Sequence, residues 1–410
     1  MSEVTAHIPL TEFAERRGRV LEGLEGSVGV ILAGRGSGSL HDSYRPHPHF
    51  EYLTGIVDEP GALLLLDPGH PDEARRTILF LEPRDPEMER WDGIRPGIDS
   101  ALKAQVGIQT VFRTPAFARF LQGAARRQKS VACLHPLAVH TQPVSPDLEI
   151  LRKVCERVPG VSLHDLSELL PRLRSVKSEN EINCLTRALE ITAEGFHAAL
   201  AMIAPGVNEF AIEEALHHGY RTNGSRGPAY GTIVGSALHG TVLHYRANSA
   251  EVQDGDMIVI DSGARYGDQE GGYGADITRT FPANGKFSPR QREIYEIVLT
   301  AQEAAIRAAR PGATFDEIDA AARGVIENAG YGDAYIHGIG HHLGLETHDA
   351  TPMGPVEANA VITIEPGIYL PEERFGVRIE DDVRVTTRGG EILGPPIPKT
   401  VDEIEQAMAR

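Results

Sequence analysis

The sequence predicts two domains: an α/β domain in the N-terminal part, and an α+β domain in the C-terminal part that is built as an internal duplication. Three observations lead to this prediction. A chain of 410 residues exceeds what one hydrophobic core normally holds. Short apolar runs alternate with helical stretches before residue 171, and a set of landmarks recurs at constant spacing after it.

The N-terminal domain is predicted from four apolar runs bounded by turn residues, a pattern typical of buried strands. These runs cover residues 28–33, 62–66, 77–81 and 131–134. A proline-punctuated region with charged helical pieces follows, and a long helix is expected to begin near Ser178. Ser178 and Glu181 match a capping box, a signature of helix N-termini. We therefore place the boundary near Pro171, which gives domains of residues 1–171 and 172–410.

The C-terminal domain repeats its landmarks. Each half has a Pro-Gly pair that opens a helix, and these pairs, at 205–206 and 311–312, are 106 residues apart. Each half then has an apolar strand that ends in an acid, and a second acid that starts another strand-like run. These acids are Asp261, Asp276, Glu365 and Glu380. Both recur after 104 residues. Pro-Gly pairs and strand-end acids are each common, but their coincidence favours a duplication related by a pseudo-twofold axis over chance.

The composition argues against several classes of function. Forty Lys and Arg against 58 Asp and Glu give a formal net charge of −18. Such a chain repels phosphate backbones and anionic lipids, so neither nucleic acid nor a membrane is expected as a partner. The three cysteines lack CxxC spacing and indicate neither a disulfide framework nor a cysteine zinc site. Without a signal peptide or a membrane-spanning apolar stretch, we expect a cytoplasmic protein.

Facing halves would bring the four acids to one centre. Two like charges about 4 Å apart repel by roughly 4 kcal/mol at an effective dielectric constant near 20, so such a cluster needs cations. The histidine-rich segment HGIGHHLGLETHD at 337–349 supplies imidazoles, of which about one is expected to bind metal. Oxygen ligands with one imidazole suit Mn²⁺, with Zn²⁺, Co²⁺ and Fe²⁺ as alternatives. Shared carboxylates favour two divalent ions and metal-assisted hydrolysis.

Several ordered motifs run along the chain. In the C-terminal domain they are TIVGS…LHY (232–245), IDSGARY…ADITRTFPANGKFS (260–288), HGIGHHLGLETHD (337–349), ITIEPGIY (362–369) and VRIEDDV (377–383). In these motifs the domain resembles the pita-bread metallopeptidases, in particular the proline-peptidase branch that contains aminopeptidase P and prolidase. Residues 44–66, YRPHPHFEYLTGIVDEPGALLLL, are similar to the creatinase-type N-terminal domain of bacterial aminopeptidase P. The resemblance implies a creatinase-like α/β domain followed by a pita-bread catalytic domain.

The resemblance also implies a full set of site residues. The five metal ligands fall on Asp261, Asp276, His341, Glu365 and Glu380. Asp276 and Glu380 are implied to bridge two ions. Asp261 is implied to hold one ion, and His341 with Glu365 the other. The residues implied to act in catalysis are Glu365, His244, His348, His337 and Arg378.

The implied reaction removes the N-terminal residue from peptides with proline in the second position, an Xaa-Pro aminopeptidase activity. Glu365 is implied to shuttle a proton to the leaving proline nitrogen, while the ions and nearby imidazoles stabilise the oxyanion. A prolidase that cuts only Xaa-Pro dipeptides is the alternative within this class. A non-catalytic pita-bread binding protein is the alternative from another class, and the intact ligands count against it. A homo-oligomer, either a dimer or a tetramer, is expected.

Two features depart from the family pattern. GDQEGG adds about four residues between the first two acids, so that Asp268 and Glu270 either intrude on the metal site or lie at a solvated loop tip. His239 stands where the family commonly has asparagine, so substrate handling is expected to differ.

Outside the cluster, three further histidines and one tryptophan need an interpretation. His41, His47 and His49 are interpreted as part of a wall toward a neighbouring subunit's active site, as the resemblance implies. Trp91 is either an exposed interface residue or a core residue.

Overall fold

The computed structural model describes residues 6–36, 44–268 and 271–409, which form two compact units. The first unit consists mainly of residues 8–174, and the second mainly of residues from 175 onward. His41 and Glu270, both singled out in the sequence, lie outside the described residues. Each unit is described below by itself.

A six-stranded mixed sheet, with the order β4-β3-β2-β1-β5-β6, forms the centre of the first unit. Strand β2 is antiparallel to both neighbours, and the other adjacent pairs are parallel. The strands are β1 (Val28–Leu32), β2 (Leu63–Leu66), β3 (Thr77–Leu81), β4 (Thr110–Arg113), β5 (Ser130–Cys133) and β6 (Ser162–Asp165). The four apolar runs are thereby confirmed as β1, β2, β3 and β5. Strands β4 and β6 escaped prediction because they are short and carry few buried apolar side chains.

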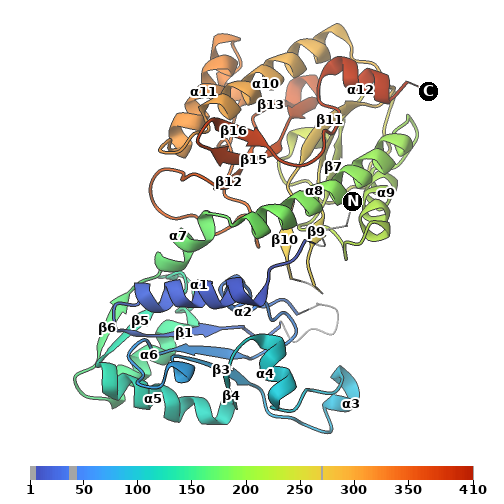
Figure 1. The fold of residues 1–410 in the computed structure, drawn as a ribbon. Coiled ribbons are helices and arrows are strands. Elements are labelled where there is room, and N and C mark those ends of the chain that lie inside the picture. The colour runs from blue at the N-terminus through green and yellow to red at the C-terminus, as the bar shows by residue number, and fades with distance from the viewer. Residues whose placement is uncertain (1–5, 37–43, 269–270, 410) are drawn as a thin grey trace. The chain divides into compact units, whose positions relative to one another are not determined.

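Helices cover the sheet of the first unit, with α1 and α5 on opposite sides of it (Figure 1). Leu121 of α5 and Leu151 of α6 belong to one buried apolar cluster with Val30 and Phe80 of the sheet. The helices are α1 (Leu10–Gly23), α2 (Pro48–Thr54), α3 (Glu89–Asp92), α4 (Ser100–Val106), α5 (Phe117–Gln128), α6 (Pro146–Arg157) and α7 (Leu169–Ser175). Trp91 in α3 is 81% exposed, which excludes the core interpretation of this residue.

The second unit has the duplicated organisation that the sequence predicts. Helices α8 and α9 precede a hairpin formed by β8 and β11, and helices α10 and α11 precede a hairpin formed by β12 and β15 (Figure 1). The helices are α8 (Glu179–Met202), α9 (Glu209–Thr222), α10 (Pro289–Ala308), α11 (Phe315–Asn328) and α12 (Val401–Ala407). The strands are β7 (Ile233–Ser236), β8 (Met257–Asp261), β9 (Arg265–Tyr266), β10 (Tyr273–Gly274), β11 (Thr278–Pro282), β12 (Val361–Ile364), β13 (Gly367–Leu370), β14 (Phe375–Arg378), β15 (Asp381–Thr386) and β16 (Gly389–Ile392).

The starts of the long helices follow local capping chemistry. The capping box between Ser178 and Glu181 is confirmed at the start of α8. The Pro-Gly pairs do not themselves open α9 and α11: both helices begin three residues later. Gly206 and Gly312 have φ angles of 89° and 90°, a left-handed conformation that a helix cannot include. Each pair therefore forms the turn that delivers the N-cap residue, Asn208 or Thr314.

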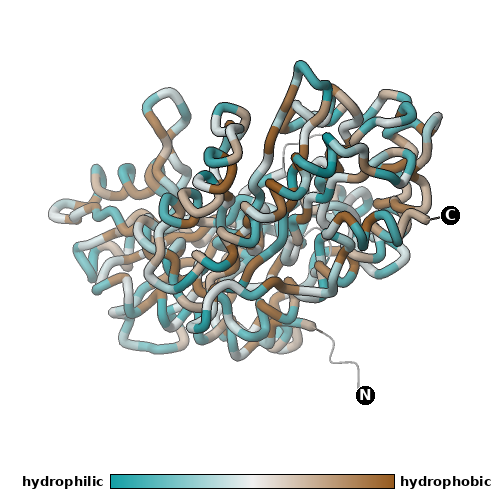
Figure 2. The backbone as a smooth tube through the Cα atoms, turned by 90° about the horizontal axis from the view of Figure 1, so that it is seen from above, coloured by the Kyte–Doolittle hydropathy of each residue, from teal (hydrophilic) through white to brown (hydrophobic). Residues whose placement is uncertain are grey.

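The two halves of the second unit share one hydrophobic core. Asp261 pairs with Thr278 in the first hairpin, and Ile364 pairs with Asp381 in the second. The backbone N–H of Glu380 donates to the carbonyl of Thr278 over 3.0 Å and joins the hairpins. Buried apolar residues from both halves form a single cluster around them. Hydrophobic and hydrophilic stretches alternate along the chain (Figure 2), and none of the described helices is apolar over a length that could cross a bilayer.

Candidate metal centre

The four predicted acids lie at strand ends of the two joined hairpins. Asp261 is the last residue of β8, and Asp276 lies two residues before β11. Glu365 directly follows β12, and Glu380 directly precedes β15. Apolar strands bury these positions: Asp276 and Glu380 are 4% and 1% exposed. The hairpins thus carry four carboxylates into the interior of one unit.

Asp276, His341 and Glu380 form a compact group. One possible ligand atom of each residue lies within 4.8 Å of those of the other two. His341 Nε2 is 3.5 Å from Asp276 Oδ2 and 3.6 Å from Glu365 Oε1. Four of the five residues predicted to bind metal are therefore neighbours in the structure.

The imidazole of His341 is oriented by its surroundings. Its backbone N–H donates to Thr363 Oγ1 over 3.0 Å, and its Nδ1 is 3.1 Å from the carbonyl oxygen of His342. A carbonyl only accepts, so Nδ1 carries the ring proton and Nε2 presents its lone pair to the carboxylates. Burial lowers the pKa of His341 to about 4, which keeps the ring in the neutral form that binds metal.

The fifth predicted ligand, Asp261, is linked to the group by two side chains. Arg378 Nη2 donates to Asp261 Oδ2 over 2.7 Å. The Tyr230 hydroxyl lies in hydrogen-bonding contact with both Asp261 and Asp276. One hydroxyl has one proton, so it cannot donate to two carboxylates at once. Either one of the two carboxylates is protonated, or the two carboxylates share a cation.

The charge balance of the group also favours the binding of cations. Desolvation, followed by repulsion from neighbouring carboxylates, raises the pKa of Asp276 and Glu380 well above their usual range. Desolvation raises the pKa of Glu365 to about 8. Within the described part of the chain, no lysine or arginine forms an ion pair with Asp276 or Glu380. Carboxylate oxygens with one neutral imidazole nitrogen fit hard to borderline divalent ions, so the residues present suit such a site.

Two of the histidines predicted to act in catalysis lie beside this group. The exposed ring of His348 is 4.0 Å, between centroids, from the ring of His341. His337 Nε2 is 2.8 Å from the Tyr369 hydroxyl, which also accepts from Arg378 Nη1 over 3.1 Å. Hydrogen bonds therefore connect His337 to the carboxylate of Asp261 through Tyr369 and Arg378.

Among the described residues, no hydrogen bond connects the third histidine, His244, to the group of Asp276, His341 and Glu380. It is exposed in the segment that follows the short 3₁₀ helix η3 (Ala237–Thr241). His239, the departure from the family pattern, stacks on Tyr245 with centroids 4.3 Å apart and has Nδ1 3.4 Å from Glu209 Oε1. His239 thus belongs to a network around the buried Glu209.

Sequence reasoning missed the hydroxyl groups of the site. Thr278 donates to Glu380 Oε2 over 2.6 Å, Thr363 orients His341, and Tyr230 and Tyr369 bridge the charged groups. Tyr369 and Thr278 lie inside recognised motifs, but a hydroxyl beside an acid is too common to stand out. Tyr230 lies just before the first motif and carried no signal.

The described residues of the added segment between the first two acids follow β9 and precede β10. Tyr266 pairs with Tyr273 there, and Gly272 has a φ angle of 96° that favours glycine. Asp268 is exposed, in agreement with a loop tip. Glu270 cannot be placed, because it lies outside the described residues.

Two family models, curated relatives and solved structures match the chain. Residues 183–387 match the family described as metallopeptidase family M24, and residues 13–132 match the aminopeptidase P N-terminal domain. The Xaa-Pro aminopeptidase of Haemophilus influenzae is 34% identical, with 98% of both chains covered. The Xaa-Pro dipeptidase of Pyrococcus furiosus is 39% identical over 56% of this chain and 65% of its own length. A putative aminopeptidase P from Bacillus anthracis has a similar structure, with a TM-score of 0.89, 32% identity and 98% of both chains covered.

Proposed function

The chain belongs to metallopeptidase family M24, and we propose that it is an Xaa-Pro aminopeptidase, a metal-dependent hydrolase that removes the N-terminal residue from peptides with proline in the second position. Residues 1–171 are assigned to the aminopeptidase P-type N-terminal domain and 172–410 to the pita-bread catalytic domain. One observation carries the proposal: buried carboxylates with raised pKa values surround a neutral imidazole in a chain similar to Xaa-Pro aminopeptidases over its whole length.

The proposed metal ligands are Asp261, Asp276, His341, Glu365 and Glu380. When bound, two divalent ions would polarise the scissile carbonyl and lower the pKa of water. Asp276 and Glu380 are the most buried of the four carboxylates, which suits the bridging role that the resemblance implies. We infer Mn²⁺ as the preferred ion from the predominance of oxygen ligands.

Glu365 is the proposed proton carrier. Its carboxylate is the least buried of the four, and Thr363 Oγ1 is 3.4 Å from its Oε1. A carboxyl group in this position can take a proton from the attacking water and return it to the proline nitrogen, which needs one to leave. The imide nitrogen of proline has no hydrogen of its own, so this delivery matters for Xaa-Pro bonds.

The histidines and Arg378 are proposed to act around this carboxylate. His348 lies beside His341 and is exposed, so its ring can reach a bound substrate. His337 and Arg378 meet at the Tyr369 hydroxyl, and Arg378 fixes Asp261. His244 would need to come closer in the substrate complex to donate to the developing oxyanion. A cytoplasmic location and a dimeric or tetrameric state remain part of the proposal.

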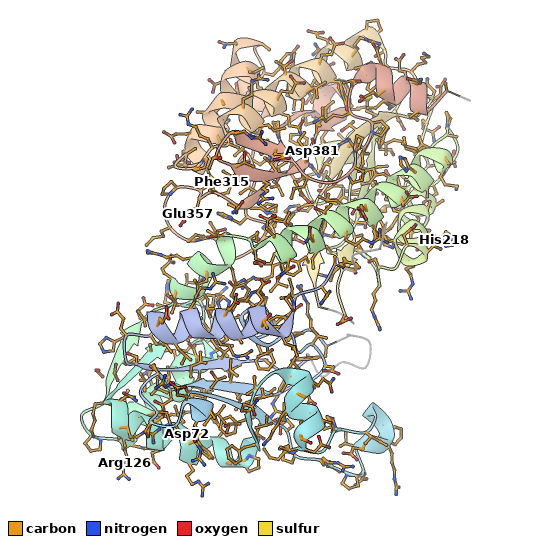
Figure 3. All side chains as sticks on the ribbon, in the orientation of Figure 1. Asp72, Arg126, His218, Phe315, Glu357 and Asp381 are labelled. Atoms are coloured by element: carbon orange, nitrogen blue, oxygen red, sulfur yellow. The ribbon has the colours of Figure 1, made fainter. Side chains whose placement is uncertain are left out.

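Peptide hydrolysis tests the proposal. The full chain should cleave an Xaa-Pro-Yaa tripeptide, lose the activity on chelation and regain it with Mn²⁺. Glu380→Gln should abolish the activity, whereas Glu357→Gln, an exposed acid of the same unit (Figure 3), should not change it. Cleavage restricted to Xaa-Pro dipeptides would favour the prolidase alternative, which the similarity to an Xaa-Pro dipeptidase supports. Activity that survives both chelation and Glu380→Gln would refute the metal mechanism.

A further inference from the structure

The first unit contains a cavity of about 740 Å³ along one edge of its sheet. Residues that follow four parallel strands line it: Gly34 after β1, Glu82 after β3, Thr114 after β4 and His135 after β5. The antiparallel strand β2 contributes its first residue, Leu63. The cavity therefore lies at the carboxyl ends of the parallel strands, and its volume is in the usual range of small-molecule sites.

The position of the cavity in the topology is that of a ligand site. From β1 the chain first builds β2, β3 and β4 on one side, and then returns to build β5 and β6 on the other. The order reverses between β1 and β5, and open α/β sheets bind ligands outside the carboxyl ends of strands at such a switch point. Here the backbone N–H of Leu32, the last residue of β1, donates to His135 Nε2 over 3.2 Å.

Hydrogen bonds fix the tautomers of two cavity histidines. His135 accepts at Nε2, so its proton is on Nδ1, because a neutral imidazole accepts at one nitrogen only. His47 accepts the backbone N–H of His49 at Nδ1 over 3.2 Å, so its proton is on Nε2. These two protonated nitrogens are 3.4 Å apart. Burial lowers the pKa of His47 to about 3 and also lowers that of His135, so neither ring is charged.

Two N–H donors therefore face each other at the cavity wall. Neither can accept from the other, and an oxygen atom beside them would satisfy both. Because His47 Nε2 and His135 Nδ1 both carry protons, they present no lone pair here to a metal ion.

Ser145 adds a third polar group. It is 7% exposed, lines the cavity, and its Oγ has no hydrogen-bond partner among the described residues. Ser145 is the N-cap of α6 but makes no side-chain capping bond, so its hydroxyl is available to a ligand as donor and acceptor. Such buried hydroxyls normally have a partner.

Charges around the cavity favour an uncharged ligand. Arg35 and Glu82 pair with each other at the wall. The carboxylate of Asp147 accepts the backbone N–H groups of Leu134 and His135 and offsets the positive end of α6. With neutral imidazoles, and with Arg35 and the positive end of α6 already paired with Glu82 and Asp147, the wall offers no free positive charge to an anionic ligand.

We propose that this cavity binds a small neutral amide with an apolar body. The carbonyl oxygen accepts from the His47 and His135 N–H groups, and the amide N–H donates to Ser145 Oγ. Ala62, Leu63 and Pro146 contact the apolar body. The proposal does not depend on the peptidase activity, because it concerns the other unit.

Calorimetric titration of the full, Mn²⁺-loaded chain tests the proposal. The probe is 4-phenylbutyramide, and 4-phenylbutyrate, which has the same body and a negative charge, is the comparison. The amide is expected to bind saturably, at least roughly tenfold more tightly than the acid. The amide should bind Asp276→Asn equally well, which separates this cavity from the metal centre.

Two variants remove one donor each. Ser145→Ala deletes the unpartnered hydroxyl and should weaken amide binding roughly five- to tenfold without lowering the melting temperature. His47→Asn keeps an acceptor for the His49 N–H but removes the facing donor, and should have a similar effect. Absence of saturable amide binding, as a cavity covered by a second copy would give, overturns the proposal. Tighter binding of the acid, or unchanged binding in Ser145→Ala, overturns it as well.

Discussion

Two neighbouring residues, Glu380 and Asp381, belong to buried carboxylate clusters of opposite character. Asp381 receives hydrogen bonds from Arg279 Nη2 (2.6 Å), Lys399 Nζ (2.7 Å) and Gln302 Nε2 (3.0 Å). These cations hold the pKa of Asp381 below its usual value even though burial alone would raise it. Among the described residues the carboxylate of Glu380 receives one hydrogen bond, from Thr278, and its pKa is raised.

Strand geometry explains how adjacent acids reach different surroundings. Successive side chains of an extended chain point to opposite sides, so Glu380 faces the candidate metal centre and Asp381 faces the α10 side. Asp381 lies inside the second unit (Figure 3). The difference teaches that burial alone does not identify a metal ligand: Asp381 is buried but paired with two cations of the chain, whereas no lysine or arginine of the described residues pairs with the Glu380 carboxylate.

The largest expected effect is on catalysis when Glu380 is changed. Glu380→Gln keeps the size of the side chain but removes the charge, and should lower kcat by at least about 10³-fold. It should leave the stability of the metal-free protein unchanged or raised, because a repelling carboxylate is lost. Kinetic assays and urea unfolding measure the two effects. If Glu380→Gln lowered the stability and left kcat unchanged, Glu380 would have a structural role and the assignment of the two clusters would be wrong.

Asp381→Asn should show the opposite pattern. It leaves the buried Arg279 without its carboxylate and should lower the free energy of unfolding by about 3 kcal/mol. Lys399 is partly exposed and can turn to water, which keeps the loss at the lower end of the range for broken buried pairs. The folded fraction should keep most of its kcat. A destabilisation below about 0.5 kcal/mol, typical of surface substitutions, would show that the cations do not depend on Asp381.

Added Mn²⁺ should stabilise the folded chain through the cluster of Glu380 and not through that of Asp381. At a free Mn²⁺ concentration of about 100 times Kd, mass action adds about 2.7 kcal/mol for each ion that binds only the folded chain. Differential scanning calorimetry should show this gain in the parent chain and in Asp381→Asn, but much less in Glu380→Gln. An equal gain in all three chains would place the ions elsewhere.

Glu365 should lower the stability of the metal-free protein as the pH rises from 6.5 to 8. Folded Glu365, whose pKa is raised to about 8, keeps most of its proton up to about pH 7.5, whereas the unfolded chain has already lost it. This group therefore lowers the stability by up to about 1.4 kcal/mol per pH unit, or about 1.7 kcal/mol in total. Buried histidines with a lowered pKa, such as His341, act in the opposite direction, because their imidazoles bind protons near pH 6.5 only in the unfolded chain. Urea titrations of the metal-free parent chain and of Glu365→Gln isolate the contribution of Glu365 as the difference between their slopes, and equal slopes would contradict it.

Much of the site follows from the sequence because its acids end or precede apolar strands. Asp261 and Glu365 close the runs MIVI and VITI, and the duplication spacing then marks Asp276 and Glu380. The segment IEDDV contains three consecutive acids, and local pattern alone does not show which of them faces a lysine. That information depends on Lys399 and Arg279, which long-range packing brings to Asp381. The duplication spacing selected Glu380 among the three, and the resemblance to the family agreed with it.

Other features of the fold could not be predicted because the sequence carries no local signal for them. Strand β6 is exposed along its length, so no hydrophobic period marks it. The tautomers of His47 and His135 depend on backbone N–H groups that only the folded sheet supplies. His244 was selected by motif, and its place in the site remains a prediction.

Counting bound metal tests the central claim most directly. After equilibrium dialysis against Mn²⁺, elemental analysis of the parent chain should give two ions per chain, and Asp381→Asn should also give two. Glu380→Gln, which loses a proposed bridging ligand, should retain fewer than two. Two ions in Glu380→Gln, or none in the parent chain, would contradict the proposal that Glu380 holds metal and that its neighbour Asp381 does not.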